Sequence, residues 1–268
     1  MSRFAIFGAA GFVGSRLVSR LEAEGHVVQG ITRANWPTPG ADLGHVIFTI
    51  GMTADFREKP FETVDAQVQK LYAALHDYTY QSFLYLSSTR VYRQQADTLE
   101  GAALALNPNN PDDLYNATKI AGESLCLTLK NPAIRVARLS NLFGVPAPSQ
   151  SFLAAVLDEA RRTGRVTFRT APDAEKDYLD VESAVSALIA IAQSGRERLY
   201  NVASGRNVSN GMLAETLASL GIACHFEPHA PAMRFSPLSV ERLAREFGHA
   251  PQSVLEALPA LLAASPED

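Results

Sequence analysis

The stretch from Phe4 to Leu17, FAIFGAAGFVGSRL, decides how this chain folds. Its first four residues are apolar and predict a buried strand. Glycines follow at positions 8, 11 and 14, and apolar residues then recur at the spacing of a helix face. A helix that begins after a glycine turn presents free backbone N–H groups and a positive dipole end to an anion. The pattern therefore predicts a pyrophosphate site for a dinucleotide, with a plain strand–turn–helix as the alternative.

The bulk properties exclude several classes of protein. The 268 residues are 47% hydrophobic and 19% charged, with a formal net charge of −4, as in ordinary globular proteins. No basic run indicates a nucleic-acid partner, and no apolar run approaches the roughly 20 residues of a membrane span. Cys126 and Cys224 lie far apart, so we expect no structural disulfide and a cytoplasmic location. The six histidines lack metal-binding spacing, and we expect no metal site.

Along the chain, apolar segments of strand length alternate with segments of helical periodicity. This alternation predicts an α/β fold, a parallel sheet with helices on both faces. Strands are expected at 4–7, 26–31, 45–50, 83–86, 133–139, 165–169, 198–202 and 222–226. Helices are expected at about 12–24, 60–77, 112–130, 150–163, 181–193 and 209–219, followed by two terminal helices.

Tyr115 and Lys119 lie four residues apart in the predicted helix 112–130, so they share one face. A nearby positive charge stabilises a phenolate, which favours a tyrosine that exchanges protons near neutral pH. The segment 85–92, YLSSTRVY, places small hydroxyls directly after an apolar strand, where open α/β sheets bind ligands. The alternatives are a surface tyrosine beside a solvated lysine, and a polar strand end.

Together these features resemble the extended short-chain dehydrogenase/reductase family, and within it the nucleotide-sugar epimerases and dehydratases. The glycines, the YxxxK pair and the post-strand motif SSTRVY all match, and the resemblance covers nearly the whole chain. Further matches are RLSNLFG at 138–144, KDYLDV at 176–181 and LYNVASG at 199–205. The implied fold is a Rossmann-like doubly wound parallel sheet with a small C-terminal substrate-binding lobe, in one domain 1–268. Its core is expected at about 1–140 plus 175–202, and its lobe at about 141–174 and 203–268.

The resemblance also implies roles for individual residues. The expected catalytic residues are Ser88, Tyr115 and Lys119; the cofactor-binding residues are Gly8, Gly11, Phe12, Val13, Gly14, Arg33 and Lys119; the substrate-binding residues are Ser87, Asn141, Lys176 and Arg234. Tyr115 would exchange a proton with a sugar hydroxyl or ketone, and Ser88 would donate to the same oxygen. Lys119 would keep Tyr115 ionised and hydrogen-bond the nicotinamide ribose.

The largest departure from the family pattern is a deletion after the second strand. Arg33 and His45 are separated by eleven residues, so a unit of about thirty residues is missing there. That unit normally contributes an edge strand and part of the adenine pocket. Trp36 is a candidate to stack on adenine, with plain packing as the alternative. No acidic residue that could bind the ribose hydroxyls of NAD ends the second strand. The basic Arg33 found there suits the 2′-phosphate of NADP, with a solvated loop residue as the alternative.

The sequence leaves the reaction open. Thr89 and Arg90 stand where dehydratases of this family carry an acidic pair, which weakens a dehydratase assignment. Two reactions on a nucleotide-activated sugar remain: that of an NAD(P)-dependent epimerase and that of a 4-ketosugar reductase. In both cases the protein is a possible homodimer. Arg93 is a candidate for a substrate phosphate or carboxylate, or a surface residue. A non-catalytic dinucleotide-binding sensor or scaffold on the same fold is the alternative from another class.

Overall fold

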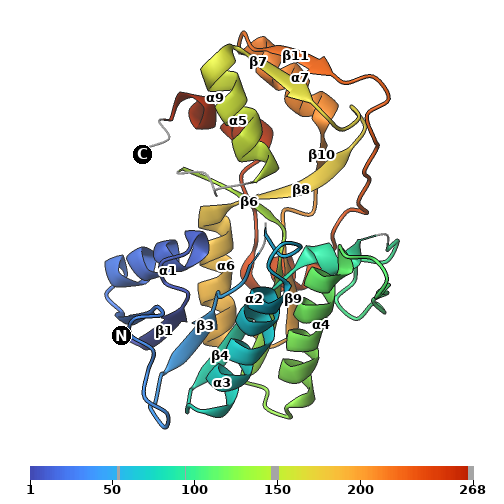
Figure 1. The fold of residues 1–268 in the computed structure, drawn as a ribbon. Coiled ribbons are helices and arrows are strands. Elements are labelled where there is room, and N and C mark those ends of the chain that lie inside the picture. Colours follow the sequence, from blue (N-terminus) through green and yellow to red (C-terminus); the bar gives the residue numbers. More distant parts are fainter. Residues whose placement is uncertain (53–54, 94, 146–150, 265–268) are drawn as a thin grey trace.

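The computed structural model describes residues 1–52, 55–93, 95–145 and 151–264. Figure 1 shows a large layered part that contains the N-terminus and a smaller part beyond the carboxyl ends of its strands. The α/β fold class predicted from the sequence is confirmed. In the described part of the chain, no helix is long and apolar enough to cross a membrane.

The large part is built on one six-stranded sheet in the order β2-β1-β3-β4-β5-β9, and every neighbouring pair is parallel. The strands are β1 (Arg3–Phe7), β2 (Val27–Ile31), β3 (His45–Phe48), β4 (Ser82–Ser88), β5 (Ile134–Leu139) and β9 (Leu199–Val202). In this order β2 is an edge strand, as expected if the missing unit is a deleted edge. The central strands stay continuous, so the deletion leaves the middle of the sheet intact.

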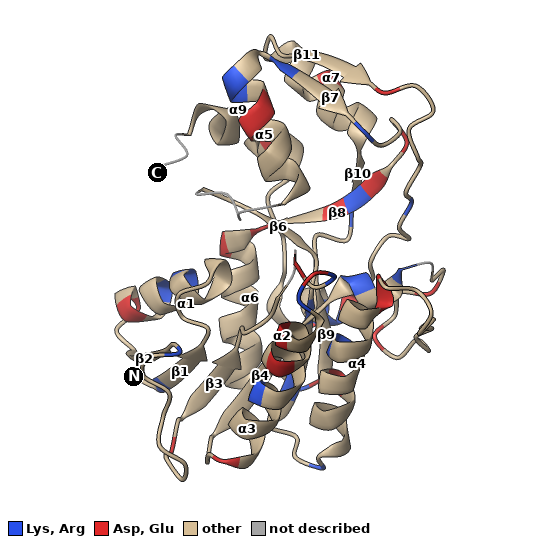
Figure 2. Cartoon of the chain, viewed as in Figure 1, with Lys and Arg blue, Asp and Glu red and all other residues tan. Residues whose placement is uncertain are grey.

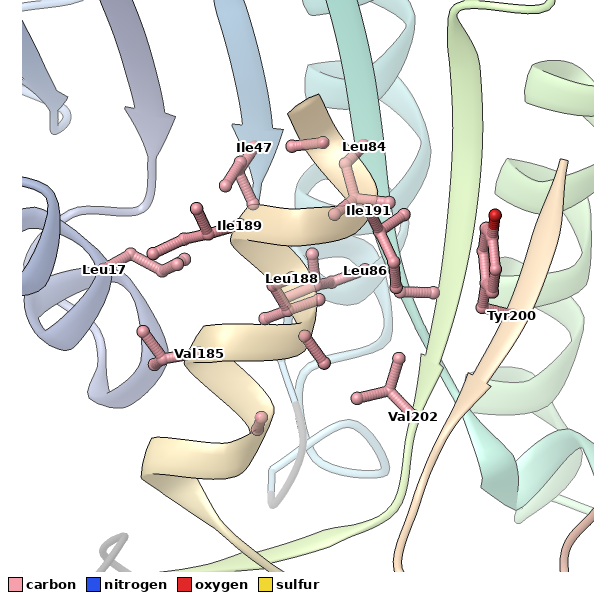
Figure 3. Close-up of a cluster of buried hydrophobic side chains, with 14 of the residues drawn as sticks. Leu17, Ile47, Leu84, Leu86, Val185, Leu188, Ile189, Ile191, Tyr200 and Val202 are labelled. Atoms are coloured by element: carbon pink, nitrogen blue, oxygen red, sulfur yellow. The ribbon is translucent and has the colours of Figure 1, made fainter. Parts of the chain in front are cut away.

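Helices cover both faces of this sheet because its strands carry apolar side chains on both sides. One face is covered by α1 (Phe12–Ala23), α6 (Val181–Ser194) and α8 (Glu241–Phe247). Figure 3 shows Leu188 and Ile191 of α6 beside side chains of β4, whereas Val185 points towards α1. The opposite face is covered by α3 (Lys70–His76) and α4 (Asp113–Thr128). The short helix α2 (Pro60–Val64) and the π-helical turn η1 (Asp65–Gln69) lead into α3 and pack on α4.

The smaller part has its own hydrophobic cluster. It contains α5 (Phe152–Thr163), α7 (Asn210–Ser219), α9 (Val254–Ala263) and the parallel pair β7 (Arg165–Phe168) and β11 (Ala223–Phe226). A three-stranded sheet in the order β10-β8-β6 belongs to the same part and joins it to the main sheet. Its strands are β6 (Asn141–Phe143), β8 (Glu175–Asp180) and β10 (Asn207–Ser209).

Three features differ from the elements expected from the sequence. The strands β6, β8 and β10 were not predicted, because each is short or mixes charged with apolar residues. The expected helix 60–77 is present but passes through the π turn, where Gln67 is buried and donates to Met52 O at 2.8 Å. Finally, α8 lies within the range 203–268 that we expected to belong to the lobe, but it packs on β9 and α6 in the large part.

Candidate active site

The glycine turn between β1 and α1 forms a tight corner. Gly8 has a φ of +84°, which favours glycine, and its N–H donates to Ile31 O at 3.0 Å. A Cβ on Gly14 would lie 2.2 Å from Gly8 O, so the third glycine allows the helix to approach the turn closely. The turn therefore brings the start of α1 next to the carboxyl ends of β1 and β2.

The start of α1 has unused hydrogen-bond donors. The first bond along the helix runs from Ser15 N to Gly11 O at 2.9 Å, and Gly11 provides no side-chain cap. The amides of Phe12, Val13 and Gly14 precede this bond, so they are free to bind an anion. Backbone donors at a helix start suit a pyrophosphate, so the residues present fit a nicotinamide dinucleotide at this position.

The adenine side of the turn is reshaped by the loop that replaces the missing unit. Arg33 is exposed two residues beyond Ile31, the last residue of β2, whose carbonyl accepts from Gly8 in the glycine turn. Trp36 packs on Phe7, with ring centroids 5.0 Å apart, and joins the cluster on that face of the sheet. Tyr78 closes the same corner by donating to Pro37 O at 2.7 Å. These contacts give Trp36 a packing role and leave the stacking role without support.

The three expected catalytic residues lie together at the carboxyl end of β4. Ser88 is the last residue of β4, and Tyr115 and Lys119 face it from α4. Tyr115 is 5% exposed, and the Nζ of Lys119 lies 5.9 Å from the centroid of its ring. Lys119 donates to Leu86 O at 2.9 Å, which fixes its ammonium group beneath the tyrosine.

The pKa of Tyr115 is raised, because burial penalises the phenolate; a hydrogen bond with Ser88 and the charge of Arg90 oppose that rise. The charge of Lys119, which the sequence analysis expected to lower the pKa of Tyr115, is not among these causes. The pKa of Lys119 is lowered to about 8 by burial, which the charge of Glu123 only partly offsets. Burial therefore favours the neutral form of both groups, the protonated phenol of Tyr115 and the uncharged amine of Lys119.

A buried polar network lies behind these residues, and we call it the floor of the site: Ser87, Tyr92, Glu123, Arg138 and Asn201. Ser87 donates to Glu123 at 2.5 Å, and Arg138 donates to the same carboxylate at 2.9 and 2.6 Å. Arg138 also donates to the Tyr92 hydroxyl, which donates to Asn201 at 2.9 Å. The hydroxyl of Ser87 is thus engaged inside the protein, and the structure gives no support to its expected role in substrate binding.

The expected substrate residues on the lobe lie on β8 and on the segments that hydrogen-bond to it. Asn141 donates to Asp177 O at 2.9 Å, which ties β6 to β8. Lys176 is half-buried with its Nζ 4.7 Å from the centroid of the Phe152 ring, and burial lowers its pKa. Arg234 is exposed and pairs with Asp173. The positive charge of Arg90 also lowers the pKa of Lys176, so these two cations lie within electrostatic reach of each other.

A cluster of charges adjoins Tyr115, and sequence reasoning missed most of it. Asp112 is contacted by Arg57 at 2.6 Å, Arg93 at 2.8 Å and Arg90 at 4.0 Å. Figure 2 shows basic and acidic segments adjoining at the end of α4 nearest the lobe. The sequence analysis considered Arg90 and Arg93 one at a time. That both contact Asp112 together with Arg57 depends on how the chain folds. Within the described residues, no group of three or more histidine, cysteine, aspartate or glutamate side chains could hold a metal ion.

Known proteins resemble this chain over nearly its whole length. It is 26% identical to a UDP-glucose 4-epimerase of Mycolicibacterium smegmatis (strain ATCC 700084 / mc(2)155), over 94% of this chain and 95% of that protein. The structure of RMD from Pseudomonas aeruginosa complexed with NADPH matches with a TM-score of 0.76 and 26% identity, over 97% and 98% of the two chains. MoeE5 in complex with UDP-glucose and NAD has the same fold, with a TM-score of 0.77, 19% identity and 97% of each chain covered.

The family assignment follows from a match that spans the glycine turn, β4, α4 and the strand β9. The model of the NAD dependent epimerase/dehydratase family matches residues 4–68 and 46–203, which together make up more than half of the chain. These residues include every part of the catalytic group described above. The chain belongs to the NAD dependent epimerase/dehydratase family.

Proposed function

We propose that this protein moves a hydride between a nicotinamide dinucleotide and one carbon of a nucleotide-activated sugar, as a 4-epimerase or a 4-ketosugar reductase. The observation that carries the proposal is the grouping of Ser88, Tyr115 and Lys119 at the end of β4, opposite the glycine turn. The resemblance to a UDP-glucose 4-epimerase supports the substrate class.

Each residue has a role that follows from its position. Tyr115 takes the proton of the sugar hydroxyl or returns it to the ketone, and Ser88 holds the same oxygen by a hydrogen bond. Lys119, fixed by Leu86 O, supplies the positive charge that stabilises the phenolate when it forms. The bound dinucleotide supplies the hydride chemistry, and Phe12, Val13 and Gly14 offer their amides to its pyrophosphate. We infer that Arg33 favours NADP through the 2′-phosphate.

The identity of the cofactor separates the two reactions. The purified protein is denatured, and any released nicotinamide dinucleotide is identified and quantified. Stoichiometric bound NAD indicates an epimerase, because the same cofactor takes and returns one hydride, and it overturns the preference for NADP. An empty protein that NADPH stabilises more than NADH indicates an exchanging reductase. If neither cofactor binds, the enzyme proposal fails.

Replacement of Tyr115 by Phe tests the catalytic assignment. Turnover should fall about 10³-fold, because the substituted ring cannot exchange a proton, while cofactor affinity stays within a few-fold. Tyr72→Phe is the control, since Tyr72 is 54% exposed on α3, and it should keep full activity. Unchanged turnover in Tyr115→Phe would exclude the proposed role of Tyr115.

A further inference from the structure

Arg90 lies over the candidate catalytic tyrosine, and among the described residues its only ionic contact is the 4.0 Å approach to Asp112. Its backbone N–H donates to Ser88 Oγ at 3.2 Å, so its position is tied to the catalytic serine. Its guanidinium carbon lies 5.6 Å from the centroid of the Tyr115 ring and 5.2 Å from that of Phe56. The two rings therefore hold the head of Arg90 beside the candidate catalytic residues Tyr115 and Ser88.

The hydrogen-bonding capacity of Arg90 is largely unused. Its Nε is buried and has no hydrogen-bond partner among the described residues. The nearest carboxylate, Asp112, lies 4.0 Å away, beyond hydrogen-bond distance. Asp112 is already engaged by Arg57 and Arg93 through shorter contacts. A guanidinium with free donors beside a catalytic residue is suited to an acceptor that arrives with the substrate.

Positive charge exceeds negative charge around this position. Arg57, Arg90 and Arg93 share the single carboxylate of Asp112, and the charge of Arg90 also reaches Lys176 from the lobe side. The exposed Arg234, which the sequence analysis expected to bind substrate, pairs with Asp173. The excess of positive charge is therefore concentrated at the catalytic end of the site, where the sugar ring would lie.

We propose that Arg90 binds a carboxylate on the sugar, so that the preferred substrate is a nucleotide-activated sugar acid rather than a neutral nucleotide sugar. The planar carboxylate matches the two-donor edge of a guanidinium, and partial burial strengthens the pair. Arg90 places a positive charge directly after the carboxyl end of β4, next to Ser88, so the charge at this position suits an anion. This inference rests on the proposed function and specifies its substrate.

The test uses pairs of nucleotide sugars that differ only in a carboxylate or a hydroxymethyl group on the ring. UDP-glucuronic acid is compared with UDP-glucose, and the corresponding acid and neutral sugars on dTDP and GDP are compared in the same way. Binding is measured by calorimetry on the Tyr115→Phe protein loaded with its cofactor, so that no turnover interferes. The acid should bind at least about tenfold more tightly than its neutral partner on the preferred nucleotide.

Two variants with opposite expected effects identify Arg90 as the cause. Arg90→Gln should abolish the preference for the acid while changing the affinity for the neutral sugar less than threefold. Asp112→Asn removes the competing carboxylate and should increase the preference for the acid. Arg169→Gln is the control for loss of one positive charge, because Arg169 is 81% exposed in the lobe, and it should change neither affinity.

The outcomes separate this inference from the proposed function. Equal affinity for acid and neutral sugars, or a preference for the neutral one, overturns the assignment of Arg90 while nucleotide-sugar binding stands. An equal loss of affinity for both sugars in Arg90→Gln would place its contact on the diphosphate and also overturns it. Failure of every nucleotide sugar to bind overturns the proposed function itself, and the substrate inference with it.

Discussion

Two ion pairs at opposite ends of the candidate site show how differently its parts are built. Glu123 and Arg138, in the floor of the site, have side chains only 4% exposed and share two hydrogen bonds. Asp173 and Arg234, on the lobe side, have side chains 50% and 70% exposed. The first pair is buried directly behind Lys119 and Ser88, whereas solvent screens the second.

The difference in exposure between the two ion pairs corresponds to the tasks of catalysis at one end and substrate binding at the other. Proton transfer requires Ser88, Tyr115 and Lys119 to keep their geometry within a fraction of an ångström, and buried side chains with satisfied hydrogen bonds provide that rigidity. Binding of a large substrate requires side chains that can rearrange as it enters. Exposed pairs such as Asp173–Arg234 exchange partners at low cost.

The largest expected effect comes from breaking the buried pair. Arg138→Met should lower the free energy of unfolding by about 3–5 kcal/mol, because it leaves the charge of Glu123 buried without its partner. Urea denaturation of the purified variant measures this loss. Adding Glu123→Gln to the same variant removes the orphaned charge and should recover part of the stability. If the double variant is no more stable than Arg138→Met, the charge of Glu123 is not the cause of the loss.

Local patterns were sufficient to predict most of the main sheet. The glycine turn, the apolar strands and the helix 112–130 follow from short-range periodicity, and the edge position of β2 follows from the length of the deletion. The three-stranded sheet of the lobe could not be predicted in the same way. β8 has the sequence EKDYLD, in which charged residues mask the strand pattern, and its pairing with β6 and β10 joins distant segments.

The candidate site was predictable only where its residues lie close together in sequence or match a motif. Ser88, Tyr115 and Lys119 meet as expected. Glu123 continues the same helix face four residues after Lys119, so its burial could have been inferred, but its partner on β5 could not. Ser87 lies on the face of β4 that α4 covers, where its hydroxyl donates to the buried Glu123 instead of reaching the substrate side. Convergence of side chains from separate segments is a property of the fold rather than of any one stretch of sequence.

Burial of Lys119 predicts a smaller effect that depends on pH. Its pKa is about 8 in the folded protein and near 10.5 in the unfolded chain, so between these values the unfolded state binds more protons. The cost of burying the charge is fully present below pH 8, and stability recovers as pH rises towards 10.5. The free energy of unfolding of wild type, relative to Lys119→Met, should therefore increase by about 2–3 kcal/mol between pH 7.5 and 10.5. A constant difference across this range would show that Lys119 is not desolvated in the folded protein.

The smallest effect is expected at the exposed pair. Asp173→Asn should leave the midpoint of urea denaturation unchanged within error, because solvent already screens the contact with Arg234. The matched control at the other end of the site is Glu123→Gln, which removes one charge from a buried pair and should shift the midpoint clearly. Asp173→Asn also frees Arg234, and if Arg234 binds the substrate as expected from the sequence, KM for the nucleotide sugar should fall by no more than about threefold. If Asp173→Asn lost as much stability as Glu123→Gln, exposure would not determine how much an ion pair contributes to the free energy of unfolding. That result would contradict the distinction between a rigid floor and an adaptable lobe.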